Sequence, residues 1–329
     1  MKKGLALLLV CGALLMAGLW WQSQQLQSVQ RSRMIMGTLV EISATGHDGL
    51  ELHRAIEAAF AEMERLEQQL SPQVATSEVA RLGNVAELEV STETREVVAA
   101  GLEVARRSRG AFDLTLGRLV KLWDVNGLRL HVPKAEAIHA ALEGIGPQAL
   151  AVQGTKIVKR QVELQPELGG VAKGYAVEAA ARKLRNAAVT SAAVNASGDM
   201  ALVGYPQQRD WRIGIRHPRH AEELLATLVL PGGAVVTSGD YERYFEVQGV
   251  RYHHLFDPRT GYPAQGCQSV TVWAGDATLA DALATAAFVL GPEQGLTLLR
   301  DWREVEGLLV AADGSVQYTP GLEGRIEWP

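Results

Sequence analysis

Cysteine is scarce in this chain of 329 residues, which contains only Cys11 and Cys267. Because Cys11 lies in an apolar N-terminal segment, the body of the chain has a single thiol and forms no internal disulfide, so its stability must come from packing. Basic residues are not in excess either, since 32 Lys and Arg stand against 37 Asp and Glu. This balance argues against a nucleic-acid-binding surface. No repeat or low-complexity linker divides the chain.

The N-terminus carries a targeting signal. Two lysines precede an uncharged run over residues 4–30, which is almost wholly apolar as far as Trp21. A basic start followed by about 18 apolar residues predicts an export signal or a short transmembrane helix. We favour an uncleaved signal anchor over residues 1–24, with a cleaved signal peptide or lipid attachment at Cys11 as the alternatives. In each case residues 31–329 form a domain outside the cytoplasm.

The rest of the chain mixes helical and strand patterns. Apolar residues recur every three to four positions over residues 50–70, the period of an amphipathic helix. Further helices are predicted over residues 93–107, 134–142, 176–184 and 276–290, and strands over residues 37–42, 162–164, 192–194, 211–215, 225–230, 233–236 and 269–273. Helices and strands alternate without a regular βαβ order, which favours an α+β fold, or an irregular α/β fold, over a doubly wound sheet.

A glycine-rich loop precedes one of these helices. Residues 168–175 read LGGVAKGY. Glycines at a helix entrance let backbone N–H groups approach an anion, and Lys173 adds a positive charge. The spacing matches neither a Walker A loop nor a dinucleotide fingerprint. The loop therefore indicates an anion site, with a purely structural glycine turn as the alternative.

A second candidate lies on the helix predicted over residues 276–290. Asp281 and Thr285 are four positions apart, so they project from the same face of this helix. Their surroundings are nearly all apolar, and a carboxylate there needs a partner or a cation. One carboxylate and one hydroxyl, with room for waters and phosphate oxygens, suit Mg²⁺. In the alternative, Asp276 caps the helix and Asp281 is an ordinary polar-face residue.

The densest group of titratable side chains is in residues 253–261, which read HHLFDPRTG. His253, His254 and Asp257 stand at the predicted junction of a strand and a proline-fixed turn. Such a concentration is unusual for plain scaffold and indicates a functional site, with satisfied structural histidines as an equal alternative. Two further segments, AFD at 111–113 and TSGDY at 237–241, are weak by themselves, and the second is predicted to be a surface turn.

Six motifs follow one another along the chain: MGT at 36–38, AFD at 111–113, LGGVAKG at 168–174, TSGDY at 237–241, HHLFDPRTG at 253–261 and ADALAT at 280–285. In this order they resemble the ApbE family, the FAD:protein FMN transferases. The resemblance implies a single α+β domain with FAD in a cleft and Mg²⁺ on its pyrophosphate.

The resemblance also implies roles for individual residues. The expected Mg²⁺ ligands are Asp281, Thr285 and the backbone carbonyl of Gly170. The expected FAD contacts are Met36, Ala111, Phe112, Asp113, Glu167, Lys173 and Leu255. A hydroxyl nucleophile needs a base, and we expect Asp281 to be that base, with His254 orienting or shuttling the proton. The histidine segment is then the wall of a flavin site, while the helix after it carries the catalysis.

Enzymes of this kind transfer FMN from FAD to a Thr or Ser of a partner protein through a phosphoester bond and release AMP. The expected acceptor is an exported subunit of a membrane redox complex, and the expected location is the periplasmic side of the inner membrane, with the N-terminus in the membrane. The alternatives are a Mg²⁺-dependent FAD pyrophosphatase, which yields FMN and AMP, and a non-catalytic, tethered flavin-binding protein.

The chain departs from the family pattern at three places. Glu167 stands where Asp is usual, and residues 195–199 read NASGD instead of Asn-x-Gly-Gly-Asp. Residues 71–78, where relatives commonly place an aromatic against the flavin, contain none. The third departure predicts a flavin contact that is weaker or differently organised.

Overall fold

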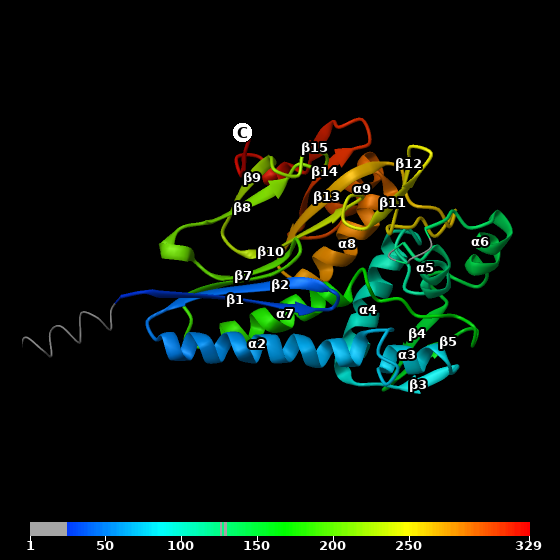
Figure 1. Cartoon of the computed structure of the whole chain (residues 1–329), viewed down its shortest axis with the longest axis horizontal. Coiled ribbons are helices and arrows are strands. Elements are labelled where there is room, and N and C mark those ends of the chain that lie inside the picture. The colour runs from blue at the N-terminus through cyan, green and yellow to red at the C-terminus, as the bar shows by residue number, and fades with distance from the viewer. Residues whose placement is uncertain (1–24, 126, 128–129) are drawn as a thin grey trace, which may run out of the picture.

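The computed structural model describes residues 25–125, 127 and 130–329 (Figure 1). The predicted signal or anchor segment, residues 1–24, lies outside this part. Within the described ranges, no helix is both long enough and apolar enough to cross a bilayer.

An eight-stranded sheet forms the centre of the molecule, and each neighbouring pair of strands is antiparallel. In order across the sheet, its strands are β1 (Gln27–Ile35), β2 (Thr38–Gly46), β6 (Ser191–Ala196), β7 (Asp199–Gly204), β10 (Gly233–Gly239), β13 (Cys267–Ala274), β14 (Glu306–Ala311) and β15 (Val316–Tyr318).

Helices cover one face of this sheet (Figure 1). They are α2 (Gly49–Leu70), α4 (Thr92–Arg107), α7 (Ala172–Arg185), α8 (Ala277–Leu290) and α9 (Pro292–Arg300). The N-terminus of α2 is fixed by the Asp48 carboxylate, which accepts a hydrogen bond of 2.8 Å from the backbone N–H of Leu50. α8 packs on the sheet at β10 and β13 and also contacts the helices α4, α7 and α9, so most of its residues are buried and its sequence is apolar on nearly every side.

A second sheet covers part of the opposite face. Its strands run in the order β16 (Ile326–Glu327), β9 (Leu224–Leu230) and β8 (Trp211–Arg216). Ile213 and Ile215 of β8 and Leu228 of β9 pack against Leu202 and Val235 of the main sheet. The main sheet is therefore buried on both faces at β7 and β10, which fixes the position of these strands beside the site.

Smaller elements extend one end of the molecule. They are α3 (Glu78–Gly83), α5 (Gly117–Trp123), α6 (Ala135–Leu142), a sheet of β3 (Glu87–Glu89), β5 (Lys156–Lys159) and β4 (Leu150–Gln153), and the hairpin of β11 (Tyr244–Val247) and β12 (Val250–His253). Away from this end, the 3-10 turn η1 (Pro206–Gln208) connects β7 to β8, and η2 (Pro320–Leu322) follows β15 and contacts β14. Trp123 is fully buried among aromatic rings of the hairpin and donates its indole N–H to the Gly261 carbonyl at 2.8 Å. This contact ties the turn after β12 to α5.

The antiparallel sheet with its helices on one face confirms the predicted α+β class. The strand predicted over residues 162–164 is wrong, because Lys159 donates to the carbonyls of Val162 and Leu164 at 2.7 and 2.8 Å and holds this segment as a loop. The surface turn predicted over residues 237–241 is wrong as well. Residues 237–239 form the end of β10, and Ser238 and Asp240 are buried.

Candidate functional site

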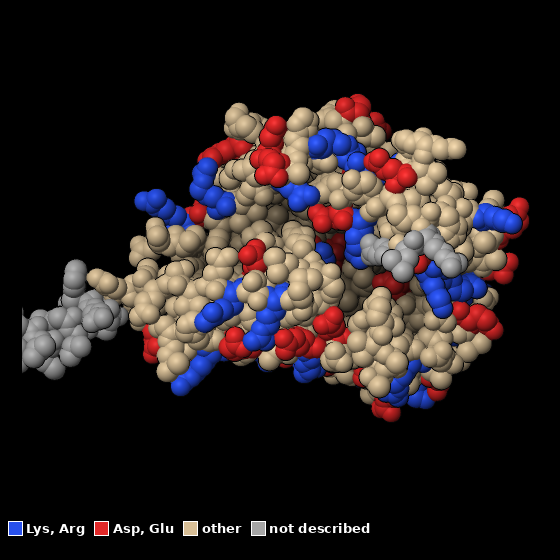
Figure 2. Space-filling model, in the orientation of Figure 1, with Lys and Arg blue, Asp and Glu red and all other residues tan. Residues whose placement is uncertain are grey.

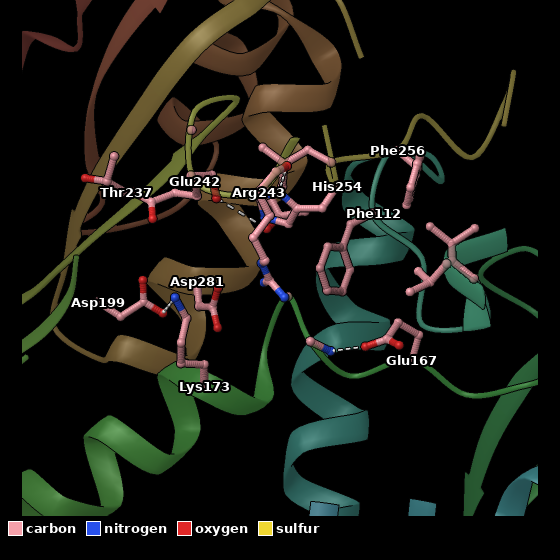
Figure 3. A pocket seen from close by; sticks show the side chains of 18 of the residues that line it. Phe112, Glu167, Lys173, Asp199, Thr237, Glu242, Arg243, His254, Phe256 and Asp281 are labelled. Atoms are coloured by element: carbon pink, nitrogen blue, oxygen red, sulfur yellow. Dashed lines mark hydrogen bonds and ion pairs between the residues drawn. The ribbon is translucent and has the colours of Figure 1, made fainter. Parts of the chain in front are cut away.

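A cavity of about 360 Å³ lies where the tip of the β1–β2 hairpin, the entrance of α7, the middle of α8 and the segment after β12 meet. Its volume is within the usual range for ligand sites. The sequence-predicted site residues all line this one cavity: Met36, Ala111, Phe112, Asp113, Glu167, Gly170, Lys173, His254, Leu255, Asp281 and Thr285. Segments that are far apart in the chain are thus brought together as the motif order predicted (Figure 3).

One wall of the cavity holds a cluster of buried charges. Asp281 accepts a hydrogen bond of 2.9 Å from the backbone N–H of Gly174. Lys173 lies with its Nζ 3.1 Å from Oδ2 of Asp199, and both point toward Asp281 (Figure 3). A Cβ at Gly174 would lie only 2.3 Å from the Ala277 carbonyl, so glycine permits the close approach of α7 and α8 that forms this wall.

The charges in this cluster do not balance. Burial raises the pKa of Asp281 to about 8, and the negative charge of Asp199 adds to the rise. Burial also raises the pKa of Asp199, although Lys173 opposes the change. Burial alone would lower the pKa of Lys173, but the two carboxylates outweigh it and the pKa is raised. Two buried carboxylates face one ammonium, which is an environment that favours an additional cation.

The predicted metal ligands lie at the same wall. Thr285 is one turn along α8 from Asp281, and its hydroxyl is 3.4 Å from that of Ser238. A Cβ on Gly170 would lie 3.2 Å from Thr285 Oγ1, so the backbone of Gly170 lies directly against this hydroxyl. Over the described ranges, no group of three or more His, Cys, Asp or Glu side chains is arranged as a metal site. A hard cation at this wall would rely on hydroxyl, carbonyl and water oxygens beside the carboxylates, which fits Mg²⁺.

The opposite wall combines apolar and acidic groups. Phe112, Leu116 and Phe256 line it with apolar surface suited to a flat ring. Asp113 accepts hydrogen bonds from Thr115 through Oδ1, at 2.7 Å from N–H and 2.5 Å from the hydroxyl. Its other oxygen is buried and has no partner within the described residues. Burial raises the pKa of this carboxyl. An unpartnered buried acceptor at a cavity wall is suited to a ligand donor.

Glu167 also lies at this end of the cavity. It accepts a hydrogen bond of 2.7 Å from the backbone N–H of Gly169, as Figure 3 shows. Burial raises its pKa, against the effect of that hydrogen bond. Its carboxylate therefore orders the glycine loop as well as lining the cavity.

The two adjacent histidines have different surroundings. His253 is buried, and its ring contacts the Ala264 carbonyl at 2.8 Å and the backbone N–H of Leu255 at 3.2 Å, so both nitrogens are satisfied. His254 lines the cavity, and its Nδ1 lies 3.2 Å from the Arg243 carbonyl. Because a carbonyl only accepts, Nδ1 carries the proton and Nε2 is left as an acceptor. Burial and the Arg243 charge lower the pKa of His254 to about 3, so the ring is neutral.

Several cavity residues were not predicted as site residues. Asp199, Glu242 and Arg243 bring charge to the cavity, and Phe256 brings an aromatic ring. Asp199 ends the NASGD motif and the other three lie in or beside the TSGDY and HHLFDPRTG motifs, so motif proximity was the available signal. Residues 71–78 do not line the cavity. The missing aromatic there leaves Phe112 and Phe256 as the rings at this site.

Comparisons with known proteins show which family the chain is similar to. The ApbE family model matches residues 36–309. The FAD:protein FMN transferase of Treponema pallidum is 32% identical over 347 residues, covering 99% of this chain and 95% of the relative. That of Klebsiella pneumoniae is 33% identical over 294 residues, covering 87% and 90%.

Solved structures give the same result. The crystal structure of the ApbE protein from Thermotoga maritima has a TM-score of 0.83 at 33% identity and covers 91% of this chain and 99% of its own. The apo form of the Pseudomonas stutzeri flavinyl transferase ApbE has a TM-score of 0.78 at 33% identity, covering 92% and 97%. The chain therefore belongs to the ApbE family of flavin transferases.

Proposed function

We propose that this protein is a Mg²⁺-dependent FAD:protein FMN transferase, which moves FMN from FAD to a Thr or Ser hydroxyl of an exported acceptor protein. The acceptor oxygen forms a bond to the FMN phosphorus, the bond from that phosphorus to the bridging oxygen breaks, AMP leaves, and the hydroxyl proton is released. The observation that carries the proposal is the single cavity with an apolar, aromatic end and an end with paired carboxylates and Lys173.

The shape and charge of the cavity fit FAD. The flavin ring lies at the end lined by Phe112, Leu116 and Phe256, and the unpartnered oxygen of Asp113 accepts from a flavin or ribityl donor. The pyrophosphate then lies toward Lys173 and the entrance of α7, where a positive charge and a helix N-terminus favour an anion. This orientation places the phosphorus atoms beside Asp281 and Thr285.

The residues of the charged wall have different roles in the transfer. Asp281, Thr285 and the Gly170 carbonyl would hold Mg²⁺, which would neutralise charge on the pyrophosphate and orient it for displacement. Asp281 accepts the hydroxyl proton, because its carboxylate lines the cavity at the wall where the pyrophosphate would lie. His254 is neutral, with Nε2 free to accept a hydrogen bond, and orients the incoming hydroxyl.

The location of the reaction follows from the sequence. The apolar segment over residues 1–24 holds the enzyme on the periplasmic side of the inner membrane, and its acceptor is an exported subunit of a membrane redox complex. Fractionation of cells expressing the full chain tests this location, since a cytoplasmic enzyme would contradict it.

The activity is tested with the purified full chain, FAD, Mg²⁺ and a candidate acceptor that carries an exposed threonine. Covalent flavin on the acceptor with an equal amount of AMP is the expected result. Free FMN and AMP without labelled protein would instead indicate a pyrophosphatase. Bound but unchanged FAD would indicate a flavin-binding protein.

A further inference from the structure

A second cavity, of about 280 Å³, lies between the main sheet and the three-stranded sheet. Its lining includes Met200 and Val235 of the main sheet and Ile213 and Ile215 of β8. Figure 2 shows a hollow on this face of the molecule between the β8–β9 strands and the β1–β2 hairpin. The cavity is the deep part of a surface groove.

The pairing register defines the floor of this groove. Asn195 pairs with Met200, and Met200 pairs with Val235, so these three side chains project from the same face of the main sheet. The roof is formed by Ile213 and Ile215 of β8. Floor and roof are mostly apolar, and the space between them suits an apolar side chain.

β8 supplies the side of the groove as an edge strand. Among the described strands, its single hydrogen-bonded neighbour is β9. An edge strand presents backbone donors and acceptors along its free side, which an extended polypeptide can pair with. Gly214 and Arg216 are exposed on this strand, so its backbone is accessible there.

The same face of the main sheet carries an exposed apolar pair on the β1–β2 hairpin. Met34 and Leu39 are directly opposite each other in β1 and β2, and they are 70% and 47% exposed. Leu39 lies on the same face as Glu41, which pairs with Asn195 of the floor. The exposed pair therefore extends the groove to the hairpin whose tip, at Met36, lines the first cavity.

The groove and the first cavity adjoin each other, because Ser197, Thr237 and Glu242 line both. We propose that an extended segment of the acceptor protein docks in this groove along β8 and over the Met34–Leu39 pair, with an apolar side chain in the second cavity. Its hydroxyl residue, a few positions away, enters the first cavity past Ser197 and Thr237. This inference rests on the proposed transferase function.

The test uses the full chain with a library of short synthetic peptides that share a central threonine and vary at every other position. Flavin fluorescence on the peptides measures transfer, and quenching of FAD fluorescence measures cofactor binding. Three apolar residues are replaced by arginine: Met200→Arg blocks the floor, Met34→Arg blocks the exposed rim, and Val162→Arg is the control, because Val162 is exposed and lines neither cavity.

The wild type is expected to select an apolar residue at a fixed distance from the threonine. Met200→Arg and Met34→Arg are expected to lose this selection and raise the peptide KM by about tenfold or more, as for a disrupted binding hot spot, while FAD binding and the thermal midpoint stay at the Val162→Arg level. Met34 is so exposed that its replacement does not threaten folding. This variant keeps the test decisive if Met200→Arg is unstable.

Other outcomes overturn the inference in distinguishable ways. Labelling without positional selection, or selection that survives both groove variants, would place the acceptor elsewhere. Labelling of a folded acceptor protein but of no peptide would mean that docking does not use an extended segment. A wild type that binds FAD but labels neither peptides nor protein would instead refute the proposed transferase function.

Discussion

Replacing Asp281 by Asn distinguishes two properties of this buried carboxylate: the folding free energy that it costs and the FMN transfer that it supports. The carboxylate is 4% exposed, and its pKa is raised from 3.8 to about 8 by burial and by Asp199. At about 1.4 kcal/mol per pKa unit, the ionised form carries a penalty on the order of 5 kcal/mol, an upper bound because water entry and side-chain movement reduce it. Asn keeps the acceptor for the Gly174 N–H and removes the charge.

The direction of the pH dependence follows from the raised pKa. The folded protein binds a proton at Asp281 more tightly than the unfolded chain does, so this group's contribution to stability is complete below about pH 4 and is lost as the pH rises through about 8. Without Mg²⁺, Asp281→Asn is therefore expected to exceed the wild type in unfolding free energy by about 2 to 3 kcal/mol above pH 8, and to match it near pH 4.

Urea unfolding followed by tryptophan fluorescence, across this pH range and with and without Mg²⁺, measures the effect. Mg²⁺ is expected to stabilise the wild type and not Asp281→Asn, and FMN transfer by the variant should fall at least about a hundredfold. Asp210→Asn is the matched control, since Asp210 is exposed. An Asp281→Asn protein that is less stable than the wild type above pH 8, or that gains as much from Mg²⁺, would refute the reasoning.

Three further predictions concern single positions. Gly174→Ala should lower the unfolding free energy by about 2 to 3 kcal/mol in chemical denaturation, because the new Cβ meets the Ala277 carbonyl at 2.3 Å, and an unchanged value would contradict the close helix approach. Ser197→Gly should raise the thermal midpoint, through a gain of about 1 kcal/mol in unfolding free energy, since Ser197 has a φ of 48°; a lower midpoint would show that the hydrogen bond between the Ser197 and Thr38 hydroxyls outweighs the strain. Cys267 should resist alkylation in the native protein and react after unfolding, because burial raises its pKa to about 12.

The sequence predicted those elements whose apolar pattern is set by one buried face. The helix over residues 50–70 agrees with α2 because its buried residues repeat at the helical period. β1 was not predicted, because residues 27–35 read QSVQRSRMI and most of them are exposed or partly exposed at the edge of the sheet. The short strands β3, β4 and β5 were also missed. They are three or four residues long, so periodicity has too few positions to act on.

The sequence predicted many of the residues that line the candidate site, but it did not predict how their charges pair. Motifs located Asp281, Lys173 and Thr285, because a lysine in a glycine-rich loop and polar residues on an apolar helix can be recognised in the sequence. The pairing of Lys173 with Asp199 depends on β6 and β7 meeting the entrance of α7, which is long-range packing. Asp113 combines a local and a long-range cause: Thr115, two positions along the chain, occupies one carboxylate oxygen, and tertiary packing buries the other.

The histidine pair shows why adjacent residues of one motif have separate roles. β12 ends at His253, and successive side chains of an extended segment point to opposite sides. His253 therefore enters the core, where its edge-to-face contact with Phe288 and its two hydrogen bonds leave no free nitrogen. His254 points to the cavity with one nitrogen free. One imidazole fixes the segment against α8, and that fixed position holds the other at the cavity wall.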